Sequence, residues 1–113
     1  MSVQIVRELA HGRWKAEALA VTVRLGIADV LADRAVPVRE LAARLEADED
    51  GVRRLLRLMV ALGVFSEAGE DTYRNNSASD LLRADHPGTL RRYALRALSP
   101  DDARESSDRL PSP

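Results

Sequence analysis

The sequence predicts a mainly α-helical domain with one small β-hairpin, and residues 36–75 carry most of the evidence for this fold class. Apolar residues recur at helical spacing in residues 37–45 and again in residues 51–62. A short acidic turn at residues 46–50 separates the two segments. Gly63 follows the second one, at the position where a glycine of positive φ commonly ends a helix. Two short helices joined by a turn are therefore expected.

A hairpin is predicted directly after these helices. Residues 64–67 and 72–74 have the composition of strands, and residues 68–71 between them form a tight turn. Two helices followed by such a hairpin constitute a winged helix-turn-helix. The face of the second helix that we expect to point inward consists of Val52, Leu55, Leu56, Met59 and Leu62.

Length and composition restrict the chain to one globular domain of modest size. It has 113 residues, of which 45% are hydrophobic, and a formal net charge of -1. That charge gives no general attraction to nucleic acid or anionic lipid. The absence of cysteine excludes disulfides and thiolate catalysis. No signal peptide or long apolar span is visible, so we expect a cytoplasmic protein without membrane association. The domain is expected over residues 1–98, with a disordered tail at 99–113.

The segment from Val3 to Leu25 is predicted to be one long helix, which Gly12 could bend. Its apolar residues fall on two opposite faces, the first with Ile5, Leu9, Ala16, Leu19 and Val23, and the second with Trp14, Ala18, Val21 and Leu25. A helix on the outside of a monomer needs only one apolar face, so the second face predicts burial against another copy of the chain. The alternative is cover by the chain's own C-terminal helix. The expected homodimer interface consists of Ile5, Leu9, Trp14, Ala18, Leu19, Val21, Val23 and Leu25.

Further short helices are expected on either side of the winged helix. Residues 27–32 form one of them. Ser77, followed three residues later by Asp80, resembles a capping box and predicts another helix start. A turn at residues 85–89 precedes a last helix that extends to about residue 98.

Four arginines are candidate nucleic-acid contacts: Arg53, Arg54 and Arg57 on the second helix of the winged helix, and Arg74 on the return strand. They support an alternative function, a DNA-binding transcriptional regulator. Three carboxylates at residues 48–50 occupy the end of the helix that would enter the major groove, where they would repel phosphate. They could equally cap the helix or pair with the arginines. Binding to nucleic acid is therefore the less favoured expectation.

The sequence assigns no catalytic, cofactor-binding or metal-binding residue. His11 and His86 are far apart and lack partners at metal-ligand spacing. The serines lack an adjacent base or the glycine pattern of a nucleophile elbow. Trp14 is interpreted as an anchor of the dimer core, or as the wall of an apolar cavity that could bind a flat aromatic ligand.

Several segments together resemble a known family. They are residues 14–19, 24–31, 40–42, 53–58, 61–65 and 81–88, and the runs Leu-Gly-Ile-Ala-Asp at 25–29 and Asp-His-Pro-Gly at 85–88 are the most specific. In this order they resemble the N-terminal dimerisation domain of S-adenosylmethionine-dependent small-molecule O-methyltransferases, especially the bacterial enzymes of secondary metabolism. The resemblance extends from about Val6 to Leu98.

This resemblance implies a domain that interlocks two subunits through its first helices and contributes to the partner's acceptor-substrate pocket. The family's cofactor loop, ribose-binding acid and catalytic histidine belong to a following domain that the sequence does not contain. We therefore expect a non-catalytic homodimerisation domain with no cofactor. A full-length methyltransferase and a small aromatic ligand are further candidate partners.

Overall fold

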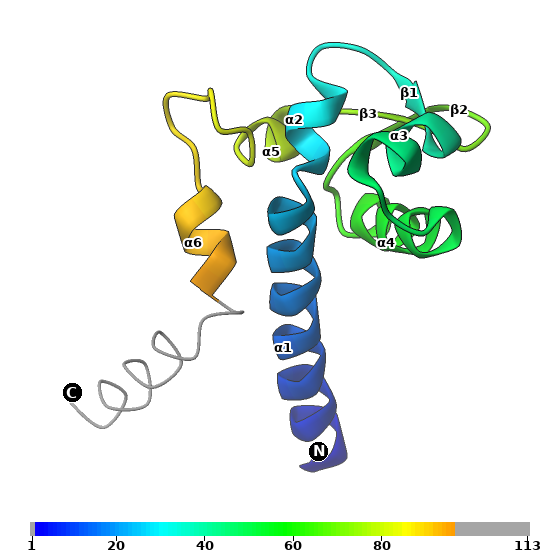
Figure 1. The fold of residues 1–113 in the computed structure, drawn as a ribbon. Helices are drawn as coiled ribbons and strands as arrows, with labels where there is room; N and C mark the ends of the chain where they lie inside the picture. The colour runs from blue at the N-terminus through cyan, green and yellow to red at the C-terminus, as the bar shows by residue number, and fades with distance from the viewer. Residues whose placement is uncertain (1, 97–113) are drawn as a thin grey trace.

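The computed structural model describes residues 2–96, with side chains from residue 12 onward. It confirms the predicted class, a mainly helical domain with a small antiparallel sheet. The longest element is α1, Ser2–Leu25, which continues unbroken through Gly12. A glycine in a helix interior destabilises the helix by only about 1 kcal/mol relative to alanine and removes no hydrogen bond, so it does not force a bend. Figure 1 shows α1 projecting away from the sheet. The expected tail at 99–113 lies outside the described residues.

The chain turns sharply after α1 and forms a second helix, α2, Ile27–Leu31. Gly26 makes this joint with a φ of 77°, in the left-handed region where a side chain would be strained. Ile27 and Leu31 are both fully buried, as expected from their spacing.

The winged helix is present, with boundaries that differ slightly from the prediction. Helix α3, Val38–Leu45, begins one residue later than expected, with Pro37 as its N-cap, whereas α4, Glu49–Ala61, begins two residues earlier and ends one residue earlier than expected. Asp48 explains the earlier start, because its carboxylate accepts a hydrogen bond of 2.8 Å from the Gly51 backbone N–H and so caps the helix. Gly63 has a φ of 91°, in agreement with its predicted role in ending the helix.

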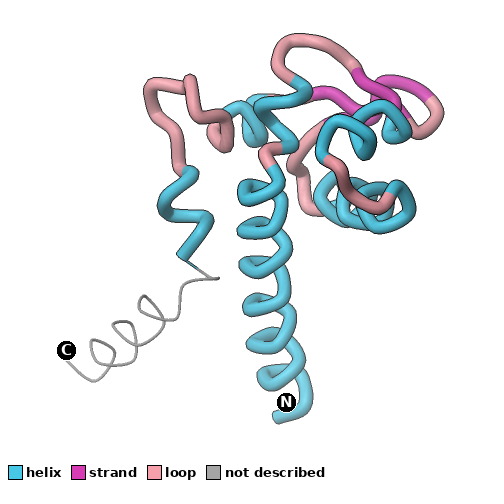
Figure 2. Tube along the Cα trace, viewed as in Figure 1, coloured by secondary structure: helices cyan, strands magenta, loops and turns pink. Residues whose placement is uncertain are grey.

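The sheet has three strands in the order β1-β3-β2, all antiparallel (Figure 2). β3, Thr72–Arg74, has its predicted bounds, and β2 is Ser66–Gly69 rather than residues 64–67. The strand starts later because Phe65 has a φ of 74°, which interrupts extended backbone. β1, Val36–Pro37, was not predicted, since two residues carry no recognisable alternation.

Two short helices complete the described chain. α5, Ser77–Asp80, is capped by Asn76 and not by Ser77, the predicted position. The Asn76 side chain accepts from the Ser79 N–H at 2.9 Å, while the Ser79 hydroxyl accepts from the Asn76 N–H at 2.8 Å. α6, Arg91–Leu95, packs along α1 on the side away from α4 (Figure 1).

Two neighbouring asparagines join the winged helix to the rest of the domain. The Asn75 amide donates to the carbonyls of Ala28 at 3.0 Å and Ala32 at 2.9 Å, which ties the end of β3 to α2. The Asn76 amide donates at 3.1 Å to the carbonyls of Gly63 and Phe65. The side chains thus donate to carbonyls at helix ends and in turns, and the Ala28 carbonyl also accepts from the Ala32 N–H at 3.1 Å.

Two carboxylates of the α2 region hold the segment that leads to α6. Asp29 accepts hydrogen bonds from the Ala84 N–H at 2.8 Å and from the Arg91 guanidinium at 2.9 Å. Arg83 donates to Asp33 at 3.0 Å and also pairs with Asp85. Hydrogen bonding to Asp85 raises the pKa of Arg83, and the same contact lowers the pKa of Asp85. These bonds fix α6 against α2 and α1.

We predict that Asn76→Ala lowers the free energy of unfolding by roughly 1–3 kcal/mol, because it removes both the cap of α5 and two donors to the preceding turn. Urea denaturation measures the change. Ser77→Ala is the matched control and should shift stability by less than about 0.5 kcal/mol, as is usual for an exposed position. Equal losses in the two variants would contradict the assignment of Asn76 as the cap.

Candidate functional site

Large apolar side chains remain exposed on one side of α1. Trp14 is 53% exposed and Val21 is 38% exposed, and both belong to the second predicted apolar face. They are seven residues apart, which places them one above the other on the helix surface. Leu25 continues the same face and is partly buried. We call Trp14, Val21 and Leu25 the exposed strip.

The chain's own elements cover most of the rest of the C-terminal half of α1, including Ala18 of the second apolar face. Ala18, Ala20, Thr22 and Val23 are buried, and Leu19 packs partly buried against the same core. The Thr22 hydroxyl donates to the Ala18 carbonyl at 2.8 Å, which satisfies a buried polar group inside the helix.

The predicted interface residues therefore fall into three groups. Trp14 and Val21 are exposed, Leu19 and Leu25 are partly buried, and Ala18 and Val23 lie in the protomer's own core. The side chains of Ile5 and Leu9 lie outside the described part. Helix α6 does pack on α1, as the alternative interpretation supposed, yet Trp14 and Val21 remain exposed beside it.

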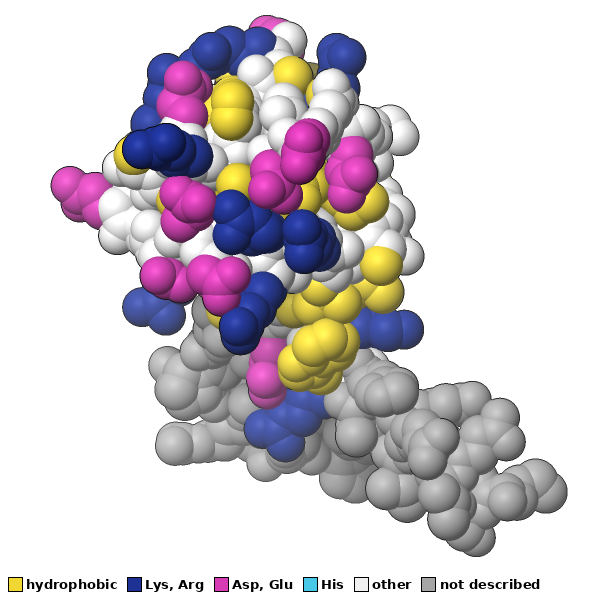
Figure 3. Space-filling model, turned by 90° about the vertical axis from the view of Figure 1, so that its right-hand side faces the viewer, with side chains coloured by type: hydrophobic (Ala, Val, Ile, Leu, Met, Phe, Trp, Pro, Cys, Tyr) yellow, Lys and Arg dark blue, Asp and Glu magenta, His cyan; other side chains and the backbone are white. Residues whose placement is uncertain are grey.

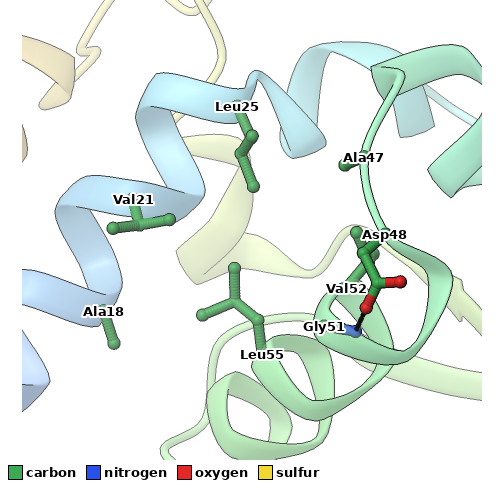
Figure 4. Close-up of a pocket in the computed structure, with 8 residues that line it drawn as sticks. All are labelled: Ala18, Val21, Leu25, Ala47, Asp48, Gly51, Val52 and Leu55. Atoms are coloured by element: carbon green, nitrogen blue, oxygen red, sulfur yellow. Dashed lines mark hydrogen bonds between the residues drawn. The ribbon is translucent and has the colours of Figure 1, made fainter.

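A first apolar groove separates the exposed strip from the beginning of α4. Its volume is about 330 Å³, and it is lined by Ala18, Val21, Leu25, Ala47, Asp48, Gly51, Val52 and Leu55. In Figure 4, Leu25 projects from α1 and Leu55 projects from α4 into the space between the two helices. Asp48 is the one charged residue of the lining. The groove is therefore an apolar trough with a carboxylate at one end.

A second groove lies on the other side of the place where α1 and α4 meet. Its volume is about 350 Å³, and its lining consists of Lys15, Ala16, Leu19, Met59, Leu62 and Val64. Leu62 was expected to point inward but is 38% exposed. The helical period that predicts its orientation ends at Ala61, because Leu62 is already the C-cap residue of α4.

The arginines of α4 are engaged by carboxylates of the same domain. Arg53 lies 2.9 Å from Glu49, 3.6 Å from Asp50 and 3.3 Å from Asp71 of the hairpin turn. The hydrogen bond to Glu49 is the main cause of its raised pKa. Its Nε is buried and has no hydrogen-bond partner, but it lies at ion-pair distance from the Asp71 carboxylate, which offsets its charge. Arg53 thus ties the wing to α4.

Two further candidate nucleic-acid contacts are also paired. Arg54 lies 3.0 Å from Asp50 and Arg57 lies 3.5 Å from Asp71. Among the described residues, Arg74 is the member of the set for which no ion pair is present. Figure 3 shows the result, a surface on which arginine and carboxylate side chains alternate above a patch of hydrophobic side chains. The basic face expected from the sequence is therefore largely neutralised.

Residues suited to chemistry do not gather in the described part of the chain. Within it, no group of three or more His, Asp or Glu side chains could hold a metal ion. The Nδ1 atom of His86 accepts a hydrogen bond of 2.9 Å from the Gly88 N–H, which stabilises a turn. The side chain of His11 lies outside the described part. None of the described helices is both long and apolar enough to cross a membrane.

The family follows from comparison with known proteins. The model of the O-methyltransferase dimerisation domain matches residues 7–85. The chain therefore belongs to the O-methyltransferase dimerisation domain family, in agreement with the resemblance seen in the sequence.

Individual relatives are enzymes of natural-product biosynthesis. The chain is 34% identical over 91 residues to the phenazine O-methyltransferase PhzM of Lysobacter antibioticus, and 36% identical over 83 residues to the mitomycin biosynthesis 6-O-methyltransferase of Streptomyces lavendulae. These alignments cover 80% and 73% of this chain but only 27% and 24% of the two relatives. The chain thus spans about a quarter of their length.

Solved structures agree with this assignment. The methyltransferase CalO6 superimposes with a TM-score of 0.78 at 34% identity, over 98% of this chain and 37% of that one. The riboflavin-derivative dimethyltransferase RosA of Streptomyces davawensis gives a TM-score of 0.83 at 28% identity, over 99% and 33%. The matched region of both proteins is a fraction of a longer chain, as in the sequence comparison.

We predict that this chain does not retard duplex DNA in a mobility-shift assay, even at low salt, because its helix arginines are already paired. A matched variant, Glu49→Gln/Asp50→Asn/Asp71→Asn, releases these arginines and should bind weakly, with an affinity that falls steeply as salt is added. A wild-type shift that disappears in Arg53→Ala/Arg57→Ala would instead favour the transcriptional regulator.

Proposed function

We propose that the chain is a non-catalytic dimerisation module that pairs with a second copy of itself through the exposed strip of α1. The observation that carries this proposal is the exposure of Trp14 and Val21 on a helix whose other side is buried in the protomer. Exposed side chains of this size, aligned on one helix face, are characteristic of a protein interface. Membership in the dimerisation domain family supports a second copy as the partner.

The names of the relatives indicate the kind of metabolism in which this module acts in our proposal. They are named as O-methyltransferases of phenazine, mitomycin and tetracenomycin biosynthesis, and we propose that this chain serves secondary metabolism too. The same strip would accept the dimerisation domain of a complete methyltransferase, since the relatives share the fold of this chain. In such a pair this chain would add apolar side chains to the wall of a small-molecule pocket, and catalysis would belong to the complete partner.

We predict that the wild-type chain sediments as a dimer at micromolar concentration and that Val21→Asp shifts it to a monomer. The new carboxylate would be buried without a partner at the interface, which costs several kcal/mol. Val21 is preferable to Leu19 for this test, because Leu19 also packs against the protomer's core. Ala43→Asp, an exposed position on α3, is the control and should remain dimeric. A folded wild-type monomer would disprove the proposal.

A further inference from the structure

One aromatic side chain and one groove on the same protomer have complementary properties. Trp14 is the largest of the exposed apolar side chains that the structure describes, and it lies at one end of the exposed strip. At the other end of the strip, Val21 and Leu25 form one wall of the first groove. The groove is apolar over most of its lining and is open to solvent beside the strip. Its volume of about 330 Å³ is sufficient for an indole ring.

We infer that Trp14 of one copy docks in the first groove of the other copy, between α1 and α4, and that the reverse contact forms at the same time. This inference rests on the proposed homodimer and specifies its geometry. A two-fold dimer requires self-complementary contacts, in which each element that inserts on one subunit meets its receptor on the other. The exposed strip supplies both the inserting side chain, Trp14, and one wall of the receiving groove, Val21 and Leu25, on one face of α1.

The spacing along α1 fits an antiparallel crossing of the two helices. If the two-fold axis passes near Ala18, Trp14 lies about 6 Å along the helix on one side of it, and the groove residues Val21 and Leu25 lie about 5–11 Å on the other. Ala18 lines the same groove but is already buried within its own protomer, so the contacts across the axis would come from Trp14, Val21 and Leu25.

Charge complementarity favours the same arrangement. Trp14 stands between Arg13 and Lys15; Arg13 is paired with Glu17 at 3.1 Å, whereas Lys15 is exposed and has no ion pair among the described residues. The groove carries Asp48 in its lining, whereas Glu49 and Asp50, which follow it in the first turn of α4, are already paired with Arg53 and Arg54. The hydrogen bond that Asp48 accepts comes from the uncharged Gly51 N–H, so no cation neutralises it among the described residues. Lys15 would approach Asp48 as the indole of Trp14 enters the groove.

A cross-linking experiment tests this geometry, because the chain has no cysteine of its own. Trp14→Cys and Leu55→Cys are made as separate single variants, mixed in equal amounts and treated with a short thiol-specific bismaleimide, because the room taken by the indole can exceed the Cα separation of about 7 Å that a disulfide spans. In a mixture of single variants such a cross-link can only join two chains. We expect the Trp14→Cys/Leu55→Cys pair to form a covalent dimer. A mixture of Trp14→Cys with Glu70→Cys, in the exposed hairpin turn, is the control and should not form one.

Sedimentation separates failure of this inference from failure of the proposed function. We expect Trp14→Ala to raise the dissociation constant of the dimer roughly 30-fold, the loss typical of a buried tryptophan anchor. A wild-type dimer whose cysteine variants do not cross-link as stated, or whose affinity is unchanged in Trp14→Ala, would overturn the docking geometry alone. A wild-type monomer would overturn the homodimer and the docking geometry together.

Discussion

Helix α1 has more apolar surface than its own protomer covers, and much of the molecule can be understood from this constraint. Helices α4 and α6 both pack on its C-terminal half, where Ala18 and Ala20 permit close contact because their side chains are small. Trp14 and Val21 remain on the uncovered side, and burying one such side chain is worth about 2 kcal/mol. That free energy is gained only on association, which links the packing of a single helix to assembly.

The winged helix of this domain does not by itself establish DNA binding, because the same fold serves different functions in different proteins. Its second helix has three arginines, a number that would suit phosphate binding. Each of them lies within 4 Å of a carboxylate of the same domain, so that Arg53 joins the wing to α4 and does not face solvent as a free cation. These ion pairs hold the wing and α4 together, and α4 in turn packs on α1 and forms part of both grooves.

Strong periodicity made the larger elements predictable, whereas short elements depended on tertiary contacts. Strand β3 has the predicted bounds and helix α3 differs from the prediction by one residue, because apolar spacing and turn residues define them locally. β1 exists only because β3 lies beside it, and a pattern of two residues cannot reveal that pairing. The prediction of the interface was less precise. The sequence identified two apolar faces on α1 but could not show that Val23 would be buried in the protomer's own core.

Asn75 and Asn76, the two asparagines that follow β3, have a consequence for how the domain responds to pH. Amide side chains carry no proton that titrates in water, so the four bonds from Asn75 and Asn76 to backbone carbonyls have the same strength in acid and in alkali. The ion pairs around Arg83 and Arg53 weaken when their carboxylates are protonated. On acidification the surface ion pairs would therefore weaken first, while the asparagine hydrogen bonds that join the winged helix to the rest of the domain would persist.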